Sequence, residues 1–155
     1  MGLEIGRLAV RRSAFVRASV ARVWREFETA ERIRGWLDRG HTLHAIELRV
    51  GGRAELSVEI DGKRRHFGGP VLVFEREREL SLETRWTEPW EADFSRLPPT
   101  YWTFRLTPLY SGTHVELLHH GFELAGDAAA DSLEGYEQGW DTKHLLALRG
   151  IVEGE

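Results

Sequence analysis

The hydrophobic pattern of the chain changes its period once, and this change limits the folds that the chain can adopt. Between residues 44 and 119, apolar residues alternate with polar ones, and turn signals such as Asp61-Gly62 and Ser111-Gly112 interrupt the alternation. A period of two predicts strands that bury one face, and short turns predict that neighbouring strands are antiparallel. The six expected strands are 44–50, 53–60, 71–75, 80–86, 102–106 and 115–119.

After the last of these strands, the pattern becomes helical. The side chains that form the helical stripe fall within about 60° of one direction on a helix. They are Leu133, Tyr136, Trp140, His144, Ala147, Leu148 and Ile151. A helix over 131–152 would extend about 33 Å, which is enough to cross a strongly curved sheet. We therefore expect one long C-terminal helix that covers the apolar face of the sheet.

The N-terminal part predicts one more strand and two short helices. Residues 7–18 alternate loosely, and Ser19 and Thr29 are suited to N-cap positions. The expected helices lie near 19–28 and 30–37. The whole pattern predicts an α+β fold, with a curved antiparallel sheet around a long C-terminal helix and two short helices after the first strand.

Composition excludes several classes of function. The chain has 155 residues, which fits a single domain over 1–155, and it has no cysteine for disulfides, thiol nucleophiles or thiolate metal sites. The net charge is −4, whereas nucleic-acid binders carry a basic excess. No apolar run approaches the roughly 18 residues of a membrane span. We therefore expect a cytoplasmic protein with no nucleic-acid partner and no membrane span.

The order of these elements resembles the helix-grip fold of the START-like or SRPBCC superfamily. Within it, the chain resembles the bacterial, single-domain branch of the family named after the activator of the heat-shock-protein-90 ATPase. The segments that carry the resemblance are Val23–Phe27, Glu31–Trp36, Gly51–Arg53, Thr103–Pro108, Gly112–Val115 and Gly135–Asp141. The resemblance implies a cavity between the sheet and the long helix. It leaves the ligand open, because related cavities bind lipids, hormones and polyketides, and others catalyse reactions.

Aromatic and histidine side chains on the inward phase of these elements predict a ligand site. A small solid core favours Leu, Ile, Val and Phe, because Trp and Tyr need a partner for their N–H or O–H group. We therefore expect a pocket with polar groups in its wall, although an aromatic solid core is the alternative. The expected ligand contacts are Trp36, His44, Trp86, Trp102, His119, Tyr136 and Trp140, with His44 or His119 giving a directional hydrogen bond.

Three functions remain open from the sequence. The preferred one is the binding of a small apolar or aromatic ligand without catalysis. The alternative is a cyclase- or hydrolase-type enzyme in which cavity histidines and Tyr136 act as acid and base. A second alternative, implied by the resemblance, is a chaperone-partner role like that of a heat-shock ATPase activator. The sequence also leaves a homodimer open.

No metal or other cofactor is expected. His114 and His120 share the outer phase of one strand, but about 20 Å of strand separates them, so they cannot share an ion without a bend. The chain also lacks the G-x-S-x-G motif of a nucleophilic serine. The long loop 87–99, which carries Trp90 and Phe94, is expected either to form a lid over the cavity or to dock on the sheet edge.

Overall fold

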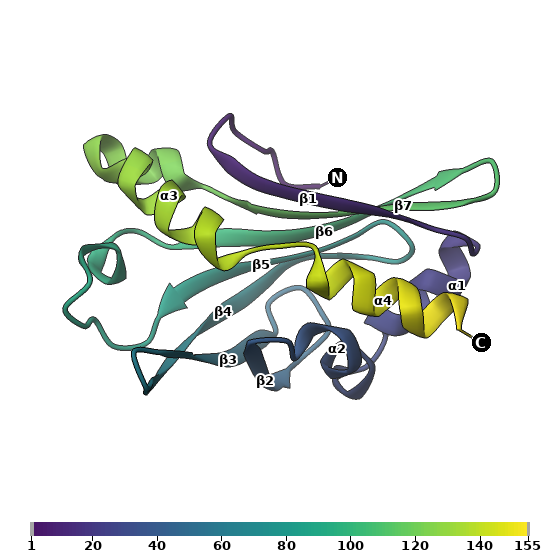
Figure 1. Ribbon diagram of the computed structural model, residues 1–155, viewed down its shortest axis with the longest axis horizontal. Helices are drawn as coiled ribbons and strands as arrows, with labels where there is room; N and C mark the ends of the chain where they lie inside the picture. Colours follow the sequence, from purple (N-terminus) through teal and green to yellow (C-terminus); the bar gives the residue numbers. More distant parts are fainter. Residues whose placement is uncertain (1, 155) are drawn as a thin grey trace.

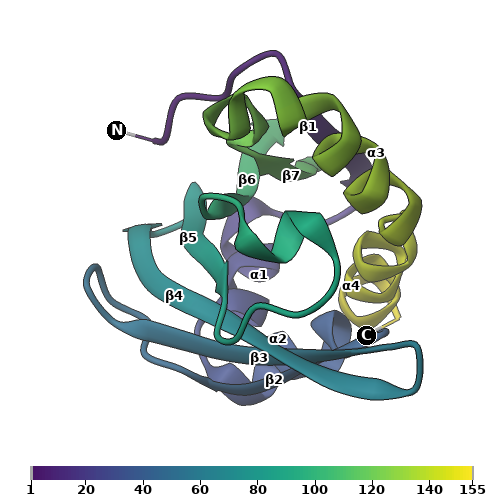
Figure 2. The same ribbon diagram turned by 90° about the vertical axis from the view of Figure 1, so that its left-hand side faces the viewer.

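Seven strands form one antiparallel sheet in the order β1-β7-β6-β5-β4-β3-β2. They are β1 Ala9–Val16, β2 His41–Ile46, β3 Arg53–Ile60, β4 Lys63–Glu75, β5 Glu79–Trp86, β6 Thr100–Leu109 and β7 Gly112–His120. The computed structural model describes residues 2–154, without the side chains of residues 93, 94, 135 and 137–139. The sheet curls around the interior, with helices along its open side (Figure 2). The α+β helix-grip fold expected from the sequence is confirmed.

The two short helical segments after β1 begin where the N-cap residues predicted. Helix α1 spans Val20–Trp24 and continues as the 3-10 helix η1 over Arg25–Phe27, and α2 spans Ala30–Leu37. The Ser19 hydroxyl accepts a hydrogen bond from the backbone N–H of Arg22, and the Thr29 hydroxyl accepts one from that of Arg32. Each bond satisfies an N–H group that has no partner in the first turn of a helix.

The C-terminal segment forms two helices, so the prediction of one uninterrupted helix over 131–152 is wrong. After the 3-10 helix η3 Phe122–Ala128, helix α3 spans Ala129–Gly139 and α4 spans Lys143–Glu153. Trp140 lies between them in an extended conformation, with φ −107° and ψ 136° (Figure 1).

Three hydrogen bonds hold this break. The Trp140 carbonyl accepts from Arg12 Nη2 at 3.0 Å, the Trp140 indole donates to His119 Nδ1 at 2.9 Å, and Asp141 Oδ1 accepts from the N–H of Lys143 at 2.7 Å. The backbone carbonyl of Trp140 therefore finds its partner on β1, the backbone N–H of Lys143 finds one on Asp141, and the indole of Trp140 is fixed to β7. Across residues 2–154, no helix has the length and apolar character needed to cross a bilayer.

The two ends of the interior are filled differently. Near α1 and α2, Phe27, Trp36 and Phe104 contact one another with ring centroids 5.0–6.0 Å apart, and all three are buried. The opposite end, beneath α3, is hollow. The space for a ligand therefore lies at the hollow end.

Candidate functional site

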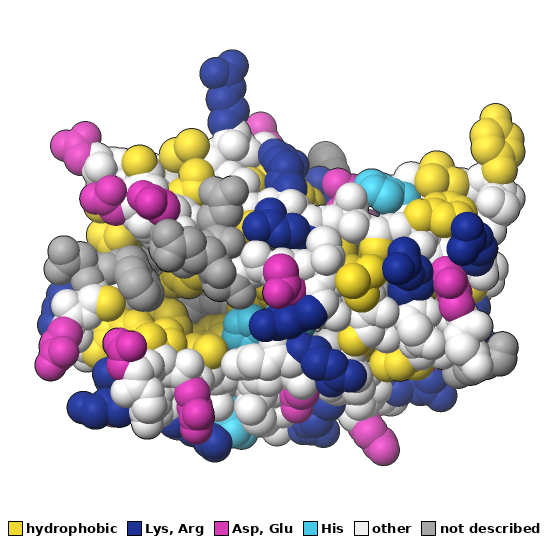
Figure 3. Space-filling model, viewed as in Figure 1, with side chains coloured by type: hydrophobic (Ala, Val, Ile, Leu, Met, Phe, Trp, Pro, Cys, Tyr) yellow, Lys and Arg dark blue, Asp and Glu magenta, His cyan; other side chains and the backbone are white. Residues whose placement is uncertain are grey.

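A pocket of about 270 Å³ opens between the sheet and α3. The surface is hollowed below this helix, and hydrophobic side chains gather around the opening (Figure 3). Aromatic rings dominate the wall of the pocket. The lining residues are His41, Val58, Glu59, Ile60, Phe67, Thr84, Arg85, Trp86, Trp102, His119, Tyr136 and Trp140.

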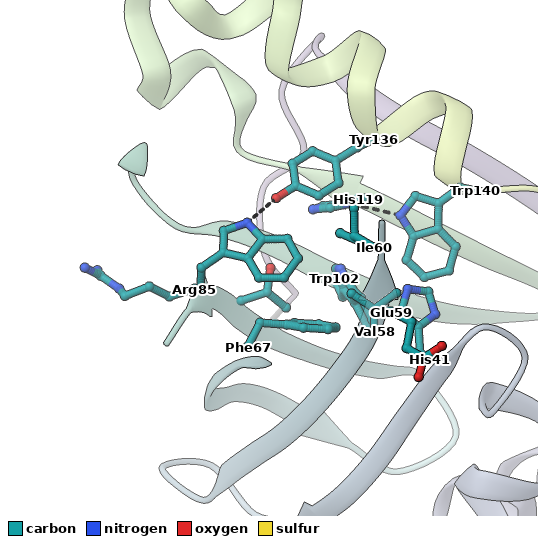
Figure 4. Close-up of a pocket in the computed structure, with 12 residues that line it drawn as sticks. His41, Val58, Glu59, Ile60, Phe67, Arg85, Trp102, His119, Tyr136 and Trp140 are labelled. Carbon is teal, nitrogen blue, oxygen red and sulfur yellow. Dashed lines mark hydrogen bonds between the residues drawn. The ribbon is translucent and has the colours of Figure 1, made fainter. Parts of the chain in front are cut away.

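The register of the sheet brings these rings together. Phe67 on β4 lies opposite Trp86 on β5, and Trp102 on β6 lies opposite His119 on β7. Phe67 also contacts Trp102, with ring centroids 5.5 Å apart. Because side chains opposite one another on paired strands share a face, the four strands β4 to β7 form a continuous aromatic floor. Tyr136 and Trp140 face this floor from the helical side (Figure 4).

His119 is a neutral, fully engaged imidazole. Its Nδ1 accepts from the indole N–H of Trp140, so the proton of the ring lies on Nε2, which donates to Thr100 Oγ1 at 2.6 Å. Burial, followed by the nearby His120 and His41, holds the pKa of His119 well below its usual range. Protonation of Nδ1 would direct two N–H groups at one another. His119 therefore orients Trp140 and is poorly suited to accept a proton.

Tyr136 is tied to the opposite wall of the pocket. The indole N–H of Trp86 donates to Tyr136 Oη at 2.9 Å, which joins α3 to β5 (Figure 4). Burial raises the pKa of Tyr136 to about 12, although the Trp86 hydrogen bond works in the opposite direction. The phenol therefore stays protonated at neutral pH.

Two other polar groups of the wall have no hydrogen-bond partner among the described residues. They are Trp102 Nε1 and His41 Nδ1, and both atoms are buried. The two rings meet edge to face, with centroids 5.2 Å apart. Burial, followed by the nearby His144 and Lys143, lowers the pKa of His41 to about 3. His41 is therefore also neutral at neutral pH.

Two of the seven residues expected at the site do not line the pocket, and Trp36 is the first. It is fully buried in the packed end of the interior, where its indole N–H donates to the carbonyl of Glu26 at 2.9 Å. Helix α2 packs against the end opposite the pocket, so its inward face cannot reach the ligand site. The expectation for Trp36 is therefore corrected.

His44 is the second expected residue that does not line the pocket, because β2 contains a β-bulge at this position. Leu43 pairs with Leu56 and Ala45 pairs with Glu55, so β2 carries one extra residue at His44. Leu43 is buried, whereas His44 is exposed and its Nε2 lies 2.7 Å from Ser57 Oγ. The extra residue turns His44 outward, and the inward phase expected for it is wrong.

The remaining five expected residues do line the pocket: Trp86, Trp102, His119, Tyr136 and Trp140. The sequence interpretation missed His41 and Phe67. His41 lies two residues before Leu43 on β2 and shares its face. It was missed because the expected strand began at residue 44, the position of the bulge. Phe67 was missed because the expected strand began only at residue 71, after Gly68-Gly69, whereas β4 begins at Lys63 and continues through these glycines. A Cβ at Gly68 would clash with the carbonyl of Ala54 on the neighbouring strand, so this glycine marks a close strand approach.

The loop 87–99 docks against the pocket wall. Trp90 is 8% exposed and lies on Trp86, with ring centroids 5.0 Å apart, while the Arg65 guanidinium lies 4.2 Å from the centroid of the Trp90 ring. The loop, with the 3-10 helix η2 Asp93–Arg96, lies at the same end of the molecule as α3 (Figures 1 and 2). The side chain of Phe94, like that of Glu137 on α3, lies outside the described residues.

A metal site has no support in the described part of the chain. There, no group of three or more His, Asp or Glu side chains is arranged to hold an ion. His120 is instead hydrogen-bonded to a polar side chain on the outer face of the sheet, since its Nε2 lies 2.7 Å from Thr103 Oγ1.

Comparison with known proteins agrees with this architecture. The family model described as "Activator of Hsp90 ATPase homolog 1-like protein" matches residues 17–153. A protein from Arthrobacter aurescens, solved by NMR, is 19% identical, with a TM-score of 0.71 over 99% of this chain and 92% of that one. CV1439 from Chromobacterium violaceum is 20% identical, with a TM-score of 0.68 over 95% and 99% of the two chains.

A third solved structure is DynU16, a protein of the dynemicin biosynthetic locus. It is 19% identical, with a TM-score of 0.65, and the match covers 96% of this chain and 48% of DynU16. At these identities the structural likeness establishes the fold alone. A search of curated proteins found no match.

Proposed function

We propose that this chain, which belongs to the family of Hsp90 ATPase activator homologues, binds a small apolar or aromatic ligand in the pocket beneath α3. The observation that carries the proposal is the pocket itself, about 270 Å³ in volume and walled by aromatic rings from five strands, from α3 and from Trp140. Ligand sites in proteins typically occupy about 300–1,000 Å³, so this pocket suits a small ligand.

The apolar wall supplies enough free energy for such binding. Burial of apolar surface contributes about 25 cal/mol per Å², so about 300 Å² of ligand surface gives about 7.5 kcal/mol before ordering costs. The pairs Trp86–Tyr136 and Trp140–His119 hold four of the lining side chains in place through hydrogen bonds. A wall that is ordered in advance loses little entropy when the ligand binds. In this proposal, the loop that carries Trp90 gates access to the pocket.

The same contacts favour binding over acid–base catalysis. A general base needs a pKa near the working pH and a free site for the proton. Both ring nitrogens of His119 are already engaged, and the pKa of Tyr136 is raised to about 12. The pocket therefore supports recognition of a ligand better than the enzymatic alternative.

Filling the pocket should weaken ligand binding strongly without unfolding the protein. Val58 lines the pocket from β3 and is only half-buried, so Val58→Trp places an indole in the cavity with little overpacking of the core. Val50→Trp, at a position that is 64% exposed, is the matched control. Calorimetry gives the affinity for naphthalene-sized aromatic compounds. We expect these compounds to bind the wild type and Val50→Trp with similar affinity, and to bind Val58→Trp at least about tenfold more weakly.

The proposal is wrong if no small aromatic, flavonoid, polyketide or fatty acid binds the wild type. It is also wrong if Val58→Trp binds as tightly as the wild type, because the ligand would then lie elsewhere. A chaperone-partner role, which the family description suggests, would use the outer surface. Stimulation of a chaperone ATPase by the filled Val58→Trp variant would separate that role from ligand binding.

A further inference from the structure

Three tryptophans line the pocket, and they differ in what their indole N–H groups do. Trp86 donates to Tyr136, and Trp140 donates to His119. Trp102, although only 3% exposed, donates to no described residue. An indole N–H can only donate, and a buried donor without an acceptor is destabilising. The floor of the pocket therefore holds one strong donor that the protein itself does not use.

Among the described residues, none places a formal charge in the interior of the pocket near this donor. His41 and His119 are neutral, because burial lowers the pKa of each, and Tyr136 is protonated. The two charged lining residues, Glu59 and Arg85, are exposed, and Arg85 points away from the cavity (Figure 4). A carboxylate at Trp102 would lose its hydration without gaining a cation, whereas an uncharged oxygen would lose far less.

Resting on the proposed ligand-binding function, we infer that the pocket selects uncharged aromatic ligands that carry a hydrogen-bond acceptor, such as a carbonyl oxygen, and that Trp102 Nε1–H donates to this acceptor. His41 lies beside the acceptor position, since its ring meets that of Trp102 at 5.2 Å. A neutral imidazole can donate or accept through Nδ1, so His41 tolerates either kind of neighbouring group. The selectivity therefore comes from Trp102.

Three ligands of one shape test this inference. 2-Acetylnaphthalene presents a neutral acceptor, 2-isopropenylnaphthalene replaces the oxygen with carbon, and 2-naphthoate carries a negative charge at neutral pH. By calorimetry we expect the ketone to bind about tenfold more tightly than the alkene, because only the ketone satisfies the buried donor. We expect the carboxylate to bind more weakly than the ketone by at least about tenfold.

A variant and a spectroscopic signal assign the effect to Trp102. Trp102→Phe removes the donor and keeps an aromatic ring, so the ratio of ketone to alkene affinity should fall to about one. Trp36→Phe, which removes an indole from the packed end, should keep the wild-type ratio. In the wild type, one of the six indole N–H resonances should move downfield with the ketone and not with the alkene. This signal decides the matter even if a variant fails to fold.

The outcomes separate the two proposals. Equal affinity for all three ligands, or an unchanged ratio in Trp102→Phe, would overturn the selectivity and leave the binding function standing. Failure of the alkene, the ketone and the carboxylate to bind at all would overturn the inference. The binding function itself would fall only if the wider panel of aromatics, flavonoids, polyketides and fatty acids also failed to bind.

Discussion

Lowering the pH from about 7 to about 5 should reduce the free energy of unfolding by about 4 kcal/mol or more. The pKa of His41 falls to about 3 in the folded protein, and that of His119 lies well below its usual value of 6.5. The unfolded chain therefore binds more protons than the folded chain below about pH 6.5. Stability is complete above that pH and is lost as the pH falls toward the folded pKa values.

The size of this effect follows from the two histidines. Each contributes about 2 kcal/mol between pH 6.5 and pH 5, and His120 and His144, whose pKa values burial lowers to about 4, add in the same direction. The nearby backbone of Arg39 partly offsets the lowering of the His144 pKa. Neither ring nitrogen of His144 makes a hydrogen bond to a described residue. Urea unfolding followed by tryptophan fluorescence at several pH values measures the loss.

Matched variants assign the loss to particular side chains. In His41→Phe, an aromatic ring replaces an imidazole whose Nδ1 has no described partner, so we expect near wild-type stability at neutral pH and about 2 kcal/mol less acid sensitivity. His66→Phe removes an exposed imidazole and is the control. Equal unfolding free energies of the wild type at pH 7 and pH 5 would contradict the prediction.

Replacing Trp140 with alanine should lower the free energy of unfolding by about 3–5 kcal/mol. Trp140 is 5% exposed, its ring contacts Trp102 and His144 at 5.0 Å each, and its indole N–H fixes the tautomer of His119. Trp140→Phe keeps most of the contact area and leaves His119 Nδ1 without its donor. We expect this milder variant to cost about 1–3 kcal/mol.

Chemical denaturation monitored by far-UV circular dichroism gives both values. Leu146→Ala on α4 is the control, because Leu146 is 44% exposed and its loss should cost less than about 1 kcal/mol. A cost below about 1 kcal/mol for Trp140→Ala would mean that the indole contributes little packing. In that case, the break between α3 and α4 would not depend on it.

Periodicity predicted the strands well wherever the backbone was regular. The alternating segments 53–60 and 80–86 correspond to β3 and β5 within a residue of their ends. It failed at the bulge of β2, because one inserted residue shifts the phase and leaves no mark in the polarity pattern. It also failed at Gly68-Gly69, because a glycine pair signals a turn and a close strand approach equally well.

The site could be predicted only where the elements themselves were right. Trp86, Trp102 and His119 lie on regular strands, so their inward phase followed from alternation alone. The break at Trp140 could not be foreseen, since it depends on contacts with Arg12 and His119, which are distant in sequence. Which indole lacks an acceptor is likewise a property of three-dimensional contacts that no local pattern records.

The extended residue between α3 and α4 gives the two helices different mechanical roles. Helix α4 is anchored in the packed end through buried side chains such as Leu145 and Leu148, while α3 supplies Tyr136 to the wall of the pocket. Because no continuous helical backbone joins them, we expect a small adjustment of α3 around a ligand to leave α4 in place. Hydrogen exchange should therefore be faster in α3 than in α4, and ligand should slow it in α3 alone.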